Sequence, residues 1–183
     1  MKKVIFNTAI LLLAFTISCK DNKGKTGESI KTEASKEGIE IEDTEKTGTF
    51  NFDGKEVSSP VETQYFGDKE KGNFSVLCQH NSDNPTDPNF ELLQVTFLNE
   101  KDANSSQLKI YDGGGSLPMT EPEPGIVAVT LSGVGNGLGN SQFTGNEKST
   151  GTITVEDRTV TLKDVVLFNS NGDKKVVNAV LPY

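Results

Sequence analysis

The chain has 183 residues and a formal net charge of −8, with 26 acidic against 18 basic residues. Tight nucleic-acid binding depends on clustered Lys and Arg side chains. This chain has one arginine, Arg158, and its lysines are scattered among acids, so its composition excludes nucleic acid as a partner and disfavours direct attraction to anionic lipid headgroups.

Residues 1–18 have the features of a cleaved export signal. Lys2 and Lys3 form a positive start, residues 4–17 form a largely apolar run, and the small Ser18 precedes Cys19. The run is shorter than the roughly 20 residues that a membrane-spanning helix needs. Cleavage would remove two lysines and no acid, which leaves a net charge of about −10.

The pair Ser18-Cys19 resembles the lipobox of bacterial lipoproteins, in which signal peptidase II cuts before a cysteine that is then acylated. Thr16 departs from the usual large aliphatic residue, and this relaxed form is similar to that of Bacteroidota lipoproteins. The resemblance implies a palmitate-type anchor on Cys19 and a place in the cell envelope, at the outer membrane. The acidic cluster that directs such proteins to the cell surface is incomplete at Lys20-Asp21, so the periplasmic and surface sides both stay open.

A polar linker is expected over residues 19–46, because this stretch has no aromatic residue and too little apolar surface to offset the entropy of ordering. An alternative is that residues 38–44 form a strand, since Ile39 and Ile41 alternate with acids. Residues 47–183 are long enough for a single domain. With Cys19 acylated, Cys78 has no partner for an internal disulfide, so a hydrophobic core must hold the domain together.

From Thr47 onward, short runs of Val, Ile, Thr and Phe alternate with turn-forming residues. Asp53-Gly54 predicts a type I′ hairpin over residues 47–61. A bulge is expected near Lys163-Asp164, where the alternation of apolar residues changes phase. Further strands are expected over residues 73–80, 92–98, 107–111, 126–132, 151–156, 159–168 and 175–181. About 8–10 strands without a helical period indicate an all-β fold, either an antiparallel β-sandwich or a partly open β-barrel.

Candidates for catalysis and metal binding are few. His80 is the single histidine, and no serine has the surroundings of a hydrolase nucleophile. Cys78 and His80 share a strand face about 7 Å apart, but a zinc site needs further ligands, and packing at the strand end is the favoured interpretation. Asp83 and Asp87 lie in a loop, residues 81–89, whose oxygen-rich side chains suit calcium but also suit any turn. No metal, cofactor or catalytic residue is assigned.

Glycines recur at every second position from Gly133 to Gly139. No helix is expected after them, so a phosphate-binding loop is disfavoured. They form either a loop at the rim of a binding mouth, which we favour, or a strand with one bare face. The candidate ligand-binding residues of this segment are Gly133, Gly135, Asn136, Gly137 and Gly139. Tyr65 is the best candidate for an exposed aromatic residue, although tyrosine at a strand end is commonly part of the core.

These features predict a lipid-anchored envelope protein with a non-catalytic β domain for binding or envelope assembly. We expect loops 81–89, 113–124 and 133–140 to contact an envelope protein or a glycan. One alternative is a carrier similar to a lipocalin, which requires a large dry cavity. Another is a carbohydrate-active or metal-dependent hydrolase, which requires a cleft with a carboxylate of raised pKa or a site built on His80. The oligomeric state stays open.

Overall fold

A computed structural model describes residues 39–80, 86–105, 108–117 and 123–183, with side chains from Lys46 onward. The export signal, Cys19, most of the expected linker and Asp83 lie outside the described residues. The described residues all belong to one compact unit. Within the described part of the chain, no helix is both long enough and apolar enough to cross a membrane.

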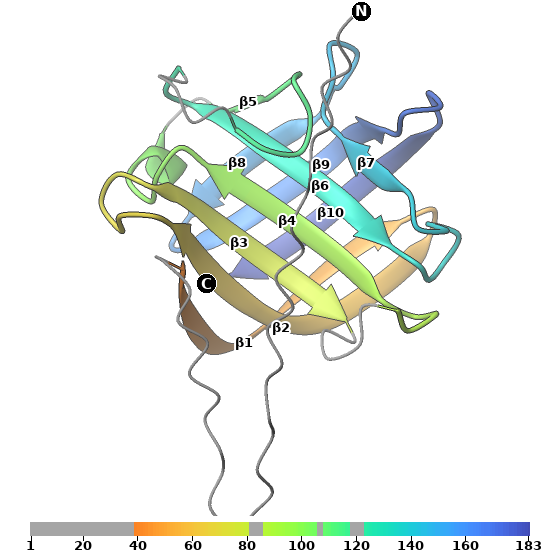
Figure 1. The fold of residues 1–183 in the computed structure, drawn as a ribbon, viewed down its shortest axis with the longest axis horizontal. Helices are drawn as coiled ribbons and strands as arrows, with labels where there is room; N and C mark the ends of the chain where they lie inside the picture. Colours follow the sequence, from red (N-terminus) through yellow and green to blue (C-terminus); the bar gives the residue numbers. More distant parts are fainter. Residues whose placement is uncertain (1–38, 81–85, 106–107, 118–122) are drawn as a thin grey trace, which may run out of the picture. The chain divides into compact units, whose positions relative to one another are not determined.

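Within these described ranges the fold consists of ten strands and one short 3-10 turn, η1 (Figure 1). The strands are β1 (Ile39–Phe52), β2 (Lys55–Phe66), β3 (Asn73–His80), β4 (Glu91–Phe97), β5 (Lys109–Ile110), β6 (Ile126–Gly133), β7 (Gln142–Thr144), β8 (Thr152–Glu156), β9 (Thr159–Phe168) and β10 (Lys174–Pro182); η1 is Asp102–Asn104. The Asp53-Gly54 hairpin is confirmed, with φ of 52° and 74°. Asp157 and Arg158, with φ of 47° and 55°, form a second two-residue turn between β8 and β9.

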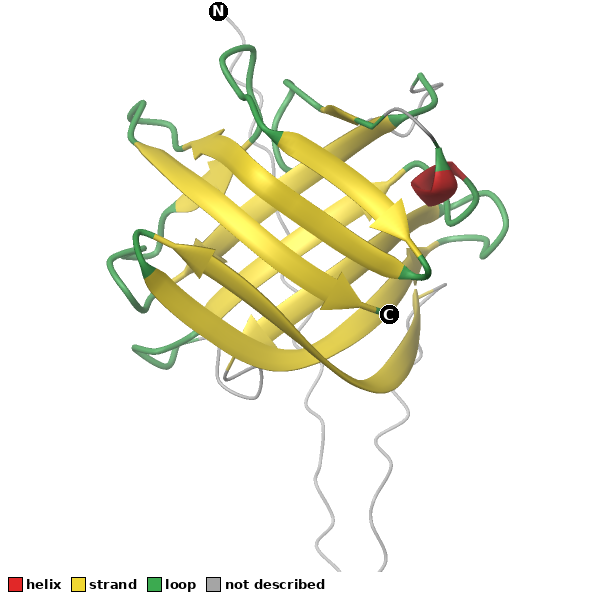
Figure 2. Cartoon of the chain, turned by 180° about the vertical axis from the view of Figure 1, so that it is seen from behind, coloured by secondary structure: helices red, strands yellow, loops and turns green. Residues whose placement is uncertain are grey.

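The sheet closes on itself as an antiparallel barrel. The strands follow the order β10-β1-β2-β3-β4-β6-β7-β9, and β9 pairs with β10 to complete the ring of eight. Figure 2 shows the two crossing layers of strands that this closure produces. The all-β prediction is confirmed, and the barrel forms rather than the sandwich. The ring is joined by several residue pairs at most of its junctions and by the single pair Thr144–Phe168 between β7 and β9.

Three local features refine the expected strands. β1 begins at Ile39 and pairs with β2 from there, so the strand alternative for residues 38–44 is the one that forms. β5 is reduced to two residues, which pair in parallel with β6. The bulge is confirmed, because Asp164 has φ of 50° and the register between β9 and β10 shifts opposite it.

The barrel interior is filled with side chains. Inward residues alternate along each strand, as Phe74, Val76 and Cys78 do on β3, each with no exposed surface. Aromatic rings pack together in the interior, where the Phe74 ring centroid lies 5.1 Å from that of Tyr65 and 5.3 Å from that of Tyr183. An eight-stranded barrel is just wide enough for its side chains to fill. The interior therefore serves as the hydrophobic core.

Candidate functional site

Polar side chains line hollows at several places on the barrel, and one of these hollows lies at the end where β3 stops and β4 starts. A hollow of about 240 Å³, the mouth hollow, opens there. Its lining residues are Glu56, Val57, Ser58, His80, Asn89, Glu91 and Asn136. Residues from loops 81–89 and 133–140 thus meet at one end of the barrel, as the sequence predicts.

Glu91 is the unusual group of the mouth hollow. It occupies an inward position of β4, opposite His80 in register, and only 2% of its surface is exposed. Asn136 donates from Nδ2 to Glu91 Oε1 at 2.7 Å. Burial raises the pKa of the Glu91 carboxyl, while His80, the Asn136 hydrogen bond and Lys55 oppose the rise. Because the ionised Glu91 carboxylate is disfavoured by burial, it lowers the stability of the fold at neutral pH. Buried carboxyl groups with raised pKa values often belong to functional sites, so Glu91 is a candidate site residue.

Residues 134–140 form hydrogen-bonded turns at this end, so the loop interpretation is confirmed for them. Gly133 is the exception, because it is the last residue of β6. Leu138 enters the core with 1% of its surface exposed. An added Cβ at Gly133 would lie 2.2 Å from the Phe90 carbonyl oxygen, and one at Gly135 would lie 2.2 Å from Glu91 Oε1. Asn136, Gly137 and Gly139 have positive φ. These residues therefore fix the turn around Glu91 and leave the mouth hollow narrow.

The other candidate residues from the sequence, Cys78, Asp87 and Tyr65, lie in the core or in a turn. Cys78 lies in the core, where its Sγ is 3.6 Å from the Ser59 carbonyl oxygen, and burial raises its pKa to about 11. The Asp87 carboxylate accepts the Asn89 N–H at 2.8 Å, as in a turn. Tyr65 is 1% exposed and belongs to the core. No group of three or more His, Cys, Asp or Glu residues in the described parts of the chain is placed to hold a metal ion.

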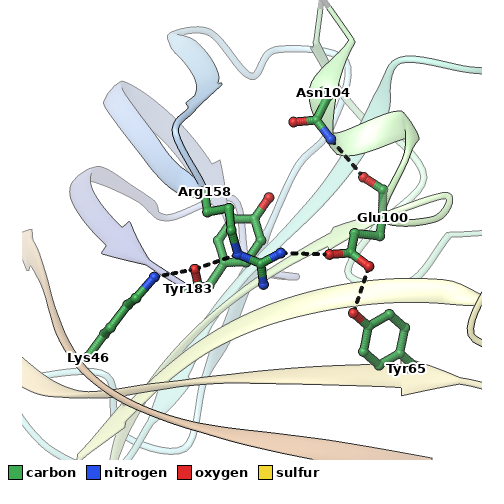
Figure 3. Close-up of polar contacts among 6 residues, drawn as sticks. All are labelled: Lys46, Tyr65, Glu100, Asn104, Arg158 and Tyr183. Atoms are coloured by element: carbon green, nitrogen blue, oxygen red, sulfur yellow. Dashed lines mark hydrogen bonds and ion pairs between the residues drawn. The ribbon is translucent and has the colours of Figure 1, made fainter.

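The opposite end of the barrel is closed by a polar network (Figure 3). Glu100 accepts from Tyr65 Oη at 2.8 Å through Oε2 and from Arg158 at 3.1 Å through Oε1. The Tyr183 main-chain oxygen accepts from Lys46 Nζ at 2.7 Å and from Arg158 Nε at 3.0 Å. The Arg158 guanidinium also stacks 4.8 Å from the Tyr183 ring centroid. These contacts join β1 and β2 to the segment after β4, the β8–β9 turn and the residue that follows β10, so we assign this network a structural role.

Another polar region lies on the outer surface of β3, β4 and β6. A groove of about 310 Å³ runs here, and we call it the outer groove. Its polar lining side chains are Asn73, Gln94, Thr96, Ser116, Thr130 and Gln142, and its apolar ones are Phe66 and Leu117. Outward residues of a barrel usually face water, yet Thr96 and Thr130 are 5% and 4% exposed. This groove is therefore a covered site on an outward face.

Hydrogen bonds fix the floor of the outer groove. The hydroxyl oxygens of Ser75 and Thr96 lie 2.7 Å apart and share a hydrogen bond. Gln94 Nε2 donates to both hydroxyls at 3.2 Å. Ser75 has no exposed surface, and it lies directly opposite Thr96 in the β3–β4 register. Because each group holds the next, the floor presents one fixed arrangement of hydroxyl and amide groups.

The segment between β5 and Leu117 forms the covering wall (Figure 1). Thr130 Oγ1 donates to the Gly115 carbonyl oxygen at 3.2 Å, which ties this segment to β6. An added Cβ at Gly115 would lie 2.6 Å from Thr130 Oγ1 and 3.2 Å from Gln142 Nε2. Only a glycine allows the backbone to approach the floor so closely. Leu117 is 5% exposed and supplies an apolar wall.

A second hollow, of about 530 Å³, adjoins the outer groove, since Gln142 lines both. Its other lining side chains are Asp112, Asn140, Ser141, Thr144, Asn146, Phe168, Asn169 and Ser170. Segment 112–114 thus meets segment 140–146 beside the outer groove. Loop 133–140 therefore shares the mouth hollow with Asn89 through Asn136 and the adjoining hollow with Gly114 through Asn140, but no hollow among the described residues is lined by all three expected loops.

The outer groove was not predicted from the sequence. Its floor residues are polar residues that alternate with apolar ones along each strand. That alternation is typical of a sheet with one face open to water. The one sequence signal is the triplet Gly113-Gly114-Gly115, which permits a close backbone approach.

No protein-family model, no curated protein and no solved structure matches this chain. Function must therefore be inferred from the geometry of the barrel and from its polar hollows.

Proposed function

We propose that this protein is a lipid-anchored protein of the bacterial cell envelope whose barrel binds a partner and catalyses no reaction. The anchor rests on the lipobox-like Ser18-Cys19 sequence. The binding role rests on one observation, the covered network of Ser75, Gln94 and Thr96 in the outer groove. The filled core already supplies the hydrophobic stabilisation of the barrel, so we infer that this fixed polar surface on an outward face serves binding.

The two alternatives fit the barrel less well. A carrier of an apolar ligand needs a cavity inside the barrel, whereas the rings of Phe74, Tyr65 and Tyr183 meet in the interior. A hydrolase has one specific observation in its favour, the raised pKa of Glu91 beside His80. However, Asn136 already occupies Glu91 Oε1, and the mouth hollow measures only about 240 Å³.

Site-specific photocrosslinking in whole cells tests the proposal. A benzophenone amino acid at Gln142, which is exposed and lines both hollows, should give a discrete adduct in the membrane fraction. The same amino acid at Thr161, which pairs with Val180 on a distant part of the barrel, is the matched control and should give none. In a Cys19→Ser variant, the protein should leave the membrane fraction.

Either of two results would contradict the proposal. Identical adducts at both positions, or none at Gln142, would remove the outer groove as a binding site. A Cys19→Ser protein that stays with the membrane would remove the lipid anchor.

A further inference from the structure

We propose that the outer groove and the adjoining hollow bind a neutral saccharide chain. This inference rests on the proposed binding function and names the ligand class for the same site. Four features support this inference. The floor presents fixed hydroxyl and amide groups, the lining is almost without charge, apolar side chains border the hollows, and the two hollows together are long enough for more than one sugar unit.

The floor matches the hydrogen-bonding character of sugar hydroxyls. Each sugar hydroxyl both donates and accepts, and it is best satisfied by groups that do the same. The hydroxyls of Thr96 and Thr130 and the amides of Gln94 and Gln142 are all of this kind. The lone pairs that the internal hydrogen bonds of the floor leave over can accept from a sugar hydroxyl. Because the Ser75–Thr96–Gln94 hydrogen bonds already hold the floor in place, a ligand would lose less free energy in ordering it.

The charge of the lining excludes ionic ligands. No Asp, Glu, Lys or Arg lines the outer groove, and Asp112 is the single ionisable residue lining the adjoining hollow. A phosphate or a uronic acid would find no cation in either hollow, and the chain's net charge of −8 would repel it. The outer groove likewise offers no carboxylate to a cation, so the expected ligand there is uncharged.

The walls and the dimensions fit a chain of sugar units. Phe66 and Leu117 border the outer groove, and Phe168 borders the adjoining hollow. Such surfaces pack against the C–H faces of sugar rings. The hollows measure about 310 and 530 Å³ and meet at Gln142, so they offer at least two neighbouring subsites. Ligand sites of this size are common.

A peptide is the competing ligand, and the strand pairing disfavours it. Extended peptides bind by adding a strand to a free sheet edge. The floor strands β3 and β4 each have a neighbour on both sides, so their main-chain groups are already paired. The groove offers side-chain groups on a strand face, which suit a hydroxyl-rich ligand better than a peptide backbone.

Calorimetric titration of the detergent-solubilised full-length protein tests the inference. The neutral probes are hexasaccharides of glucose, mannose and N-acetylglucosamine, and the anionic probe is a hexamer of galacturonic acid. We expect at least one neutral hexasaccharide to bind and the anionic hexamer not to bind. Thr96→Val should weaken binding at least tenfold, because it replaces the hydroxyl with a methyl group of similar shape. Thr161→Val is the matched control on the distant surface and should bind as the parent protein does.

Gln142→Ala provides a second test, because Gln142 is exposed and its loss should leave the barrel folded. It should also weaken binding at least tenfold. Binding of no neutral hexasaccharide, or parent-like binding by both groove variants, would overturn the inference. If the parent binds no saccharide while Gln142 still crosslinks to an envelope protein, the saccharide inference fails and the binding function stands. If neither occurs, both fail.

Discussion

Glu91 is an ionisable residue buried at an inward position of the barrel, where a neutral or apolar side chain would be expected. It lies at the inner edge of the mouth hollow with 2% of its surface exposed, and burial raises its pKa. The folded protein therefore holds the Glu91 proton more tightly than the unfolded chain does. This contribution to stability is full below the ordinary pKa of about 4.5 and is lost as the pH rises through the higher folded value.

Glu91→Gln should separate this effect from all other titrating groups. Glutamine keeps an oxygen that accepts from Asn136 Nδ2 and removes the buried charge. We expect the variant to be more stable than the parent at pH 7 to 8 and to lose that advantage as the pH falls toward 4. Urea unfolding of both proteins across this range, followed by circular dichroism, measures the difference. A variant that is less stable than the parent at pH 7 would show that attraction to His80 and Lys55 outweighs the cost of burial.

The turn that contains the glycines of residues 133–139 depends on close contact with Glu91 and not only on backbone freedom. A Cβ at Gly135 would overlap Glu91 Oε1, whereas one at Gly137 would have no atom within 4 Å and would suffer only from its φ of 81°. Gly135→Ala should destabilise the barrel by roughly 1–3 kcal/mol, as overpacked sites do. In a Glu91→Ala background this loss should shrink by at least about 1 kcal/mol, since neighbouring sites are coupled.

Gly137→Ala is the control for this coupling. Its destabilisation, of roughly 1–2 kcal/mol from the left-handed backbone, should be the same in both backgrounds. Urea unfolding of the single and double variants gives the coupling. Equal losses for Gly135→Ala with and without Glu91 would mean that its contact with the Asn89 Cα, at 2.9 Å, dominates.

Elements with a clean local pattern are the ones that the sequence predicts well. β3 matches its predicted bounds of 73–80, because inward Phe74, Val76 and Cys78 alternate with outward residues. The Asp53-Gly54 turn is equally local, since both residues tolerate positive φ. The start of β1 at Ile39 was the less favoured alternative, because its polar composition conceals its pairing with β2.

The outer groove depends on contacts between distant parts of the chain, which explains why local patterns do not reveal it. Thr96 and Thr130 have the alternation of ordinary outward residues. They become buried only because Gly115 and Leu117 return over β6, a connection that no sequence period encodes. The alternating polar residues therefore predict the strands β4 and β6 correctly, but they do not predict that another chain segment covers these residues. The mouth residues His80 and Asn136 were identified as candidates, whereas Glu91 was not, because a single acid at a strand start is indistinguishable from a surface residue.

At the scale of the whole molecule, the barrel is held by closure of its ring and by one shared core. β10 pairs with both β1 and β9, and Tyr183, which follows β10, lies in the core with 2% of its surface exposed. Its ring contacts Phe74 of β3, and its main-chain oxygen is held by Lys46 and Arg158. Arg158 makes this contact from the β8–β9 turn, where its φ of 55° is a conformation that an arginine adopts only at some cost.

Tyr183→Ala should therefore weaken the entire barrel and not only its last strand. We expect a loss of about 3–5 kcal/mol, as for other large aromatic residues in cores, with circular dichroism and amide exchange in β4 reporting the same change. Val180→Ala on β10 is the matched control, because Val180 is 49% exposed and should lose no more than about 1 kcal/mol. If β4 amides kept the protection of the parent protein while β10 opened, the barrel would not unfold as one cooperative unit. Closure through β10 would then be a local contact and not the interaction that holds the ring together.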